Sequence, residues 1–204
     1  MDKLNSTEIN NALKDVRNAY RLLALYQKRL LDIVKYAANS FNVTFDSGWS
    51  KFSSTARHGN RAYIDRVSWE WLSLYLYEFN LGAVQIGNDR YNFKIVHQAD
   101  TGFYDASVNK KIMHENVQEF SSVDTSITRL FFVLSKNDNG CPMINILNGN
   151  LKAQDNDRII NGNWLAVPYN LQMFSSQLST DDVLNGFNNI CNNIFGIDLM
   201  YVKS

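Results

Sequence analysis

The chain has 204 residues, and its 20 lysines and arginines balance its 20 aspartates and glutamates. A chain of this size can bury about 70% of the surface of its unfolded form, and its hydrophobic content of 45% is too high for a disordered protein. The balanced charge gives no support to a general attraction to nucleic acid or to an anionic membrane. No stretch approaches the roughly 20 apolar residues of a membrane span, and the polar N-terminus lacks the apolar core of a secretory signal, so we expect a cytoplasmic protein.

A helix is expected over residues 6–41, because apolar side chains recur there with an unbroken spacing of four and three residues. Nine of the ten positions are apolar, and only Gln27 is polar. The ten positions are Ile9, Leu13, Val16, Tyr20, Leu23, Gln27, Leu30, Val34, Ala37 and Phe41. From Leu22 onward the stripe widens, so we expect the second half of the helix in the core of the domain. The first half needs another apolar surface, and we predict an interface at Ile9, Leu13, Val16, Tyr20 and Leu23.

Residues 42–66 predict a long loop, and a loop of this length is a reasonable place to look for function. It combines four cations with aromatic residues, and this combination can bind phosphates while the aromatic rings stack on bases. The candidate residues for nucleic-acid or anionic-ligand binding are Trp49, Lys51, Phe52, Arg57, Arg61 and Arg66. In the alternative interpretation the aromatic residues pack onto the core and the cations face water.

The aromatic-rich residues 68–81 fit either a helix or a strand. We favour a helix, because Ser68 can cap its start and Gly82 can end it. Beyond it, three pairs of apolar runs with Asn- or Gly-containing turns predict antiparallel hairpins. The turns are expected at residues 88–90, 136–140 and 161–163, and the middle hairpin would pair residues 130–135 with 143–147. A short helix is expected around residues 108–120.

The last element is a helix that Ser179 can cap and Gly196 can end. The order of the expected elements is helices, then strands, then a helix. This order favours a single α+β domain over residues 1–204 rather than a fold built on a parallel sheet. We expect a long N-terminal helix and a second helical, aromatic segment packed on a sheet of antiparallel hairpins, closed by the C-terminal helix. Cys141 and Cys191 match no metal or redox motif, and both reduced thiols and one disulfide are compatible with their positions.

The sequence lacks the glycine-rich phosphate loop, the serine nucleophile elbow and the common zinc motifs. A weak cluster at residues 97–115 has residue types suited to metal binding or acid–base chemistry, but its spacing matches no motif. It contains His97, Asp100, Asp105, His114 and Glu115, which also suit a solvated polar loop. Glu78, Asp89 and Lys94 are distantly similar to the metal-dependent nuclease core, but Asn92 stands where that core has a second carboxylate.

We therefore expect a non-enzymatic cytoplasmic protein that acts by protein–protein association, most simply as a homo-oligomer formed through its first helix. A nucleic-acid or anionic-ligand module built on residues 49–66 is the alternative, and a hydrolase built on residues 97–115 is the third hypothesis. We predict no cofactor, no metal ligands and no catalytic residues.

Overall fold

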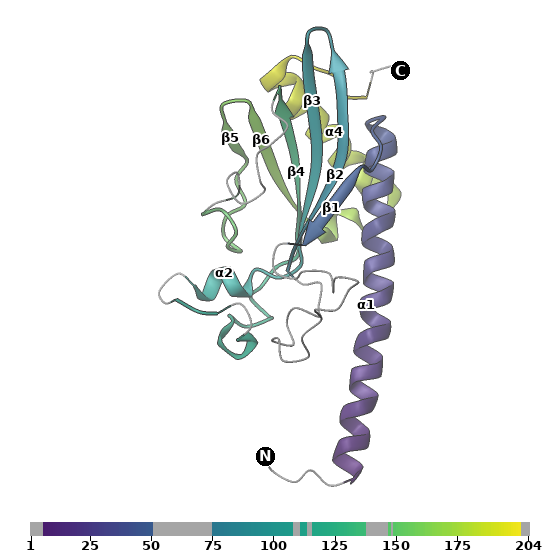
Figure 1. Ribbon diagram of the computed structural model, residues 1–204, viewed down its shortest axis with the longest axis vertical. Coiled ribbons are helices and arrows are strands. Elements are labelled where there is room, and N and C mark those ends of the chain that lie inside the picture. The colour runs from purple at the N-terminus through teal and green to yellow at the C-terminus, as the bar shows by residue number, and fades with distance from the viewer. Residues whose placement is uncertain are drawn as a thin grey trace, which may run out of the picture. The chain divides into compact units, whose positions relative to one another are not determined.

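The computed structural model describes residues 6–50, 75–107, 111–113, 116–137, 147 and 149–200. Figure 1 shows a long first helix, an antiparallel sheet and a C-terminal helix, which confirms the α+β fold. The chain divides into two compact units, Met1–Tyr36 and Ala37–Ser204. The described helices are α1 (Ser6–Ser40), α2 (Gly102–Ala106) and α4 (Gln177–Phe195), with the 3-10 helices η2 (Val117–Glu119) and η3 (Leu171–Phe174). The described strands are β1 (Ser47–Ser50), β2 (Leu76–Ile86), β3 (Asp89–Gln98), β4 (Arg129–Lys136), β5 (Ile159–Asn161) and β6 (Trp164–Asn170).

The first helix, α1, is continuous over 35 residues. Glu8 lies in its first turn, where a negative charge stabilises the helix dipole. The helix expected over residues 6–41 is therefore confirmed, and it ends at Ser40. Along its apolar stripe, Leu30 and Val34 are buried, whereas Leu13 and Tyr20 are exposed.

The sheet has six strands in the order β1-β2-β3-β4-β6-β5, and every neighbouring pair is antiparallel. Eight consecutive residues of β3, from Tyr91 to Gln98, are buried. Because successive side chains of a strand point to opposite faces, a strand that is buried at every residue is covered on both faces. The two faces of this sheet differ in chemistry.

One face of the sheet is rich in aromatic side chains and packs against α4, which runs behind the strands in Figure 1. Its central ring is Phe132 of β4, whose centroid lies 5.8 Å from that of Phe93 in β3 and 5.4 Å from that of Phe187 in α4. Phe41 follows α1 and packs edge-on at 5.1 Å from Phe93. Aromatic pairs at these distances stabilise a core beyond the area that they bury. We call this side the α4 face.

The opposite side, which we call the loop face, combines an apolar cluster with buried polar side chains. The cluster contains Leu76, Val96, Phe131, Val133, Leu147, Leu151, Trp164 and Ala166. Beside it, the fully buried Arg129 donates from Nε to Gln98 at 2.8 Å, and its terminal nitrogens donate to three backbone carbonyls of residues 150–155. Burial lowers the pKa of this guanidinium to about 10, while the charges of Asp155 and Asp105 raise it. Arg129 therefore ties residues 150–155 to the sheet.

The helix predicted over residues 68–81 is wrong for residues 76–81, which belong to β2; residues 68–74 lie outside the described residues. The aromatic side chains of this segment suit a strand, and pairing with β3 satisfies its backbone. Gly82 does not end a helix. It has a φ of +76° next to a register shift in β2, and an added Cβ there would lie 3.2 Å from the carbonyl oxygen of Thr44.

Two of the three predicted hairpins are confirmed, namely β2–β3 and β5–β6. The middle hairpin is wrong, because β4 pairs with β3 on one side and with β6 on the other. Both edges of β4 are thus occupied, and no edge is left for residues 143–147. Residues 143–146 lie outside the described residues.

The remaining predicted elements differ from the observed ones in their bounds. The loop expected over residues 42–66 contains β1, and around residues 108–120 the described residues hold only the short η2. The C-terminal helix begins one turn before Ser179, because Ser176 is its N-cap and forms a capping box with Ser179. Gly196 ends α4 in the left-handed conformation, as predicted.

Truncating the central ring of α4 is expected to destabilise the domain strongly. Phe187→Ala removes a fully buried ring that contacts Phe41, Phe93 and Phe132, so the free energy of unfolding should fall by about 3–5 kcal/mol in urea denaturation. Leu178→Ala in the same helix is the control, because Leu178 is 73% exposed and its loss should change stability by no more than about 0.5 kcal/mol. Equal denaturation midpoints for the two variants would contradict this account of the core.

Candidate functional site

Five apolar side chains lie exposed along one side of α1, and we call them the α1 seam. Their exposed fractions are 44% for Ile9, 49% for Leu13, 49% for Val16, 66% for Tyr20 and 51% for Leu23. In a helix of 3.6 residues per turn, a spacing of four and three residues keeps side chains within one narrow sector. These are the residues that the sequence predicts as an interface, and in the described part of the chain they form a continuous apolar stripe.

Exposed apolar side chains are concentrated on α1. Of the 15 large apolar side chains that are exposed among the described residues, eight belong to this helix, so it is the main apolar surface of the described chain. Leu22 and Leu25 are among them, but helical spacing places them away from the α1 seam, on a side that also carries Asn18 and Asp32. That side therefore lacks a continuous apolar stripe.

The two flanks of the α1 seam carry different side chains. On one flank, Lys14, Arg17, Arg21 and Lys28 form what we call the cationic ridge; all four are exposed, and none forms an ion pair with a described residue. On the other flank, which we call the alanine flank, Ala12, Ala19 and Tyr26 lie next to the seam, and Glu8, Asp15 and Arg29 lie further from it. The α1 seam thus separates a flank with four cations from a flank of mixed charge.

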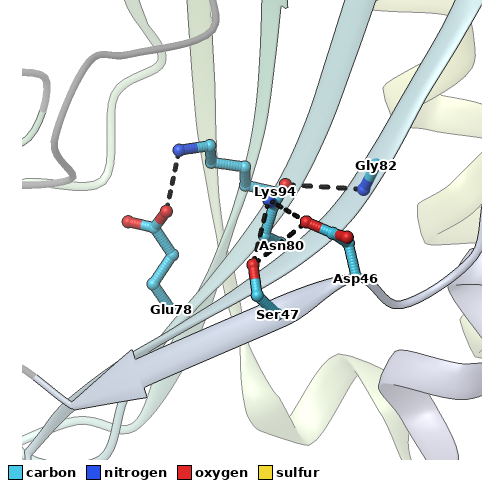
Figure 2. Close-up of polar contacts among 6 residues, drawn as sticks. All are labelled: Asp46, Ser47, Glu78, Asn80, Gly82 and Lys94. Atoms are coloured by element: carbon cyan, nitrogen blue, oxygen red, sulfur yellow. Dashed lines mark hydrogen bonds and ion pairs between the residues drawn. The ribbon is translucent and has the colours of Figure 1, made fainter.

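A second candidate is the polar cluster in Figure 2, which joins β1, β2 and β3 on the loop face. The strand register places Asn80 opposite Lys94, and Glu78 lies two residues before Asn80 on the same face. The Nζ atom of Lys94 lies 2.8 Å from Oε1 of Glu78, and both side chains are almost fully buried. Asn80 donates from Nδ2 to Oδ2 of Asp46 at 3.0 Å and to Oγ of Ser47 at 3.2 Å. We call these five residues the β1–β3 polar cluster.

The chemistry of this cluster is that of a buried ion pair with one unsatisfied acceptor. The Oε2 atom of Glu78 is buried, and no described residue donates a hydrogen bond to it. The described residues contain no group of three or more His, Cys, Asp or Glu side chains arranged to hold a metal ion. The contact joins β2 to β3. Burying the two charges costs desolvation free energy, which their mutual attraction opposes.

The nuclease-like set of Glu78, Asp89 and Lys94 does not converge. Asp89 lies at the start of β3, where it pairs with Lys136 at 2.8 Å and accepts a hydrogen bond from Asn137 at 2.7 Å. Five residues of extended strand separate Asp89 from Lys94, a distance of about 17 Å. Only the Glu78–Lys94 contact of this set is formed, so the similarity to a nuclease core does not extend to the geometry.

The described members of the predicted hydrolase cluster also lie apart. His97 is on the α4 face, because its register partners are Tyr77 and Leu130. Asp105 accepts a hydrogen bond from the backbone nitrogen of residue 153 beside the loop face, and Asp100 accepts one from the backbone nitrogen of residue 102. Both carboxylates therefore accept hydrogen bonds from the backbone of this chain. His114 and Glu115 lie outside the described residues.

The candidate anion-binding residues cannot be placed as a group. Lys51, Phe52, Arg57, Arg61 and Arg66 lie outside the described residues, and of Trp49 only the backbone in β1 is described. Sequence reasoning also missed a described residue, Arg129, because its acceptors at residues 150–155 lie more than 20 positions further along the chain. Local sequence carries no signal for a pairing of this kind.

Removing one charge of the β1–β3 polar cluster is expected to lower the free energy of unfolding more than removing both charges does. Lys94→Met leaves the buried carboxylate of Glu78 without its cation, so the free energy of unfolding should fall by about 3–5 kcal/mol. The double variant Glu78→Gln/Lys94→Met removes both charges and should recover much of this loss in urea denaturation. A double variant less stable than Lys94→Met alone would contradict this prediction, because the loss of stability would then not come from the unpaired carboxylate of Glu78.

The buried imidazole of His97 is expected to make stability depend on pH. Burial lowers the pKa of His97 from 6.5 to about 4, so between these values the unfolded chain binds a proton that the folded chain does not. The contribution of neutral His97 to the free energy of unfolding is therefore fully present above pH 6.5. The free energy of unfolding should fall by on the order of 3 kcal/mol as this contribution is lost towards pH 4. Unfolding free energies at pH 7 and at about pH 4.5 should differ less in His97→Gln than in the unmodified chain. An equal difference in both proteins would contradict the prediction.

Comparison with known proteins gives a family but no activity. No curated protein and no solved structure matches the chain. Among the described residues, no helix combines the length and the apolar content that a membrane crossing requires. Residues 6–195 match the family described as PM0109, and the match includes all of α1, the whole described sheet and α4. Because this match covers most of the sequence, the chain belongs to the PM0109 family.

Proposed function

We propose that this protein acts by protein–protein association through the α1 seam, and that it forms homo-oligomers. The observation that carries the proposal is the exposure of Ile9, Leu13, Val16, Tyr20 and Leu23, each of which presents between 44% and 66% of its surface to solvent. Monomeric proteins rarely keep a large contiguous apolar patch in water, and such patches mark interaction surfaces.

The size and shape of the α1 seam fit a helical partner. The stripe from Ile9 to Gln27 is about 27 Å long, at a rise of about 1.5 Å per residue. Side chains spaced by four and three residues interlock with a second helix of the same pattern. Moving one such side chain from water into a contact is favourable by about 1.5–3 kcal/mol when its burial is complete, and by less when part of it is already covered.

A second copy of the chain is the simplest partner, because it carries the same stripe. Closed two-fold dimers are the commonest protein assemblies, and they bring one surface against itself. We also propose a cytoplasmic setting for this assembly. In support, Cys191 is a buried free thiol, and reduced thiols are the rule in that compartment.

Two adjacent leucines of α1 offer a matched test of the proposal. Leu23 belongs to the α1 seam, whereas Leu22 lies on the other side of the helix, and both are exposed. Leu23→Glu should remove two buried leucines from each dimer and weaken dimerisation by about a hundredfold, or about 3 kcal/mol. Leu22→Glu makes the same chemical change outside the interface and should leave dimerisation within about threefold of the unmodified chain. Sedimentation velocity over a range of concentrations measures both effects.

Two results would contradict the proposal. One is equal weakening by the two substitutions, because it would show that the effect does not depend on the side of the helix. The other is a mass of 23.4 kDa for the unmodified chain at every concentration, because no dimer would then exist to be weakened. Circular dichroism of both variants checks that α1 keeps its helical content.

A further inference from the structure

We infer that the second copy binds parallel and in register, so that each residue of the α1 seam meets the same residue of its partner. This inference rests on the proposed function and names the orientation of the partner at that same surface. Two features of α1 carry it: the unlike flanks of the seam, and the exposed polar residue Gln27, which is the next position of the same stripe after Leu23.

The flanks of the α1 seam favour parallel helices. When two helices pack along one seam in parallel, the right flank of one meets the left flank of the other, and when they are antiparallel, like flanks meet. A parallel pair therefore sets the cationic ridge of one helix beside the alanine flank of the other. An antiparallel pair gathers both cationic ridges, with Lys14, Arg17, Arg21 and Lys28 of each chain, on one side. Like charges held close together repel, so the parallel pair is favoured.

Small residues on the alanine flank strengthen this preference. Ala12 and Ala19 leave room beside the seam, and the long methylene stems of Arg17 and Arg21 can cover apolar surface while their charges stay in water. The charged ends then lie on opposite sides of the helix pair. The flank that meets the cationic ridge also carries the acidic Glu8 and Asp15, whereas none of the four cations has an ion pair with a described residue of its own chain.

The position of Gln27 favours alignment without a shift. Along the stripe, positions of two kinds alternate, and Gln27 belongs to the kind that includes Leu13 and Tyr20. In a parallel pair in register, its amide meets the amide of the partner, and each can donate to and accept from the other. In an antiparallel pair it would face a position of the other kind, represented by Ile9, Val16 and Leu23, all of which are apolar. A polar residue in such a seam is known to specify register in coiled coils.

Disulfide cross-linking tests the orientation with two single-cysteine positions. Ile9→Cys and Val16→Cys are introduced separately in the full chain carrying Cys141→Ser. Cys191 is kept, because burial raises the pKa of its thiol to about 12 and leaves it unreactive. Asn18→Cys is the control, since helical spacing places this exposed residue on the far side from the seam. The fraction of covalent dimer after mild oxidation is measured on gels, and the mass of each reduced variant by light scattering.

A parallel pair in register predicts that both Ile9→Cys and Val16→Cys cross-link, each at least about tenfold faster than Asn18→Cys, because their thiols are held together. In an antiparallel pair, residue numbers rise along one helix while they fall along the other. A given residue can then lie opposite its own copy at one point only, so at most one of the two variants can form a disulfide with the same variant in the partner. A dimeric mass with cross-linking at one position only, at neither, or equally at Asn18→Cys would overturn the orientation and leave the proposed association standing. A monomeric mass for all the reduced variants and for the unmodified chain would overturn both.

Discussion

The proposed function depends on one physical constraint, namely that a continuous apolar stripe is unfavourable in water. From Leu30 onward the side chains of the α1 stripe are buried, whereas from Ile9 to Leu23 they are exposed. In proteins, most of the stability of a helix comes from packing of its apolar side, because ordering the backbone costs conformational entropy. In the association that we propose, burial of the α1 seam against a second helix would stabilise the first half of α1.

The rest of the described chain uses its polar side chains to hold its own backbone. Arg129 binds three carbonyls of residues 150–155, and the carboxylates of Asp100 and Asp105 accept hydrogen bonds from backbone nitrogens. The Glu78–Lys94 pair joins two strands inside the sheet. These residue types are the ones that an enzyme would use, but here their partners are other parts of the chain. The α1 seam differs from these residues, because its apolar side chains are exposed to solvent.

The elements with strong local signals could be predicted from the sequence, and those decided by distant pairing could not. The period of the stripe predicted α1, and Gly196 predicted the end of α4. In contrast, residues 76–81 carry apolar residues at both helical and strand spacing, and only pairing with β3 decides for a strand. The partner of β4 is β6, 28 or more residues further along, so the nearer run at 143–147 was the wrong choice. At the site, the α1 seam could be predicted because helical spacing alone defines it, whereas the ion pair between Glu78 and Lys94 depends on the register of β2 and β3.

The mass of the unmodified chain in solution tests the central claim most directly. Sedimentation equilibrium of the full chain should be run at concentrations up to about 100 μM, where even a weak micromolar dimer is populated. If the α1 seam of one chain packs against that of another, the mass should rise with concentration towards twice 23.4 kDa. A mass that stays at 23.4 kDa throughout would contradict the account, since the seam would then remain in water at concentrations where a partner is abundant.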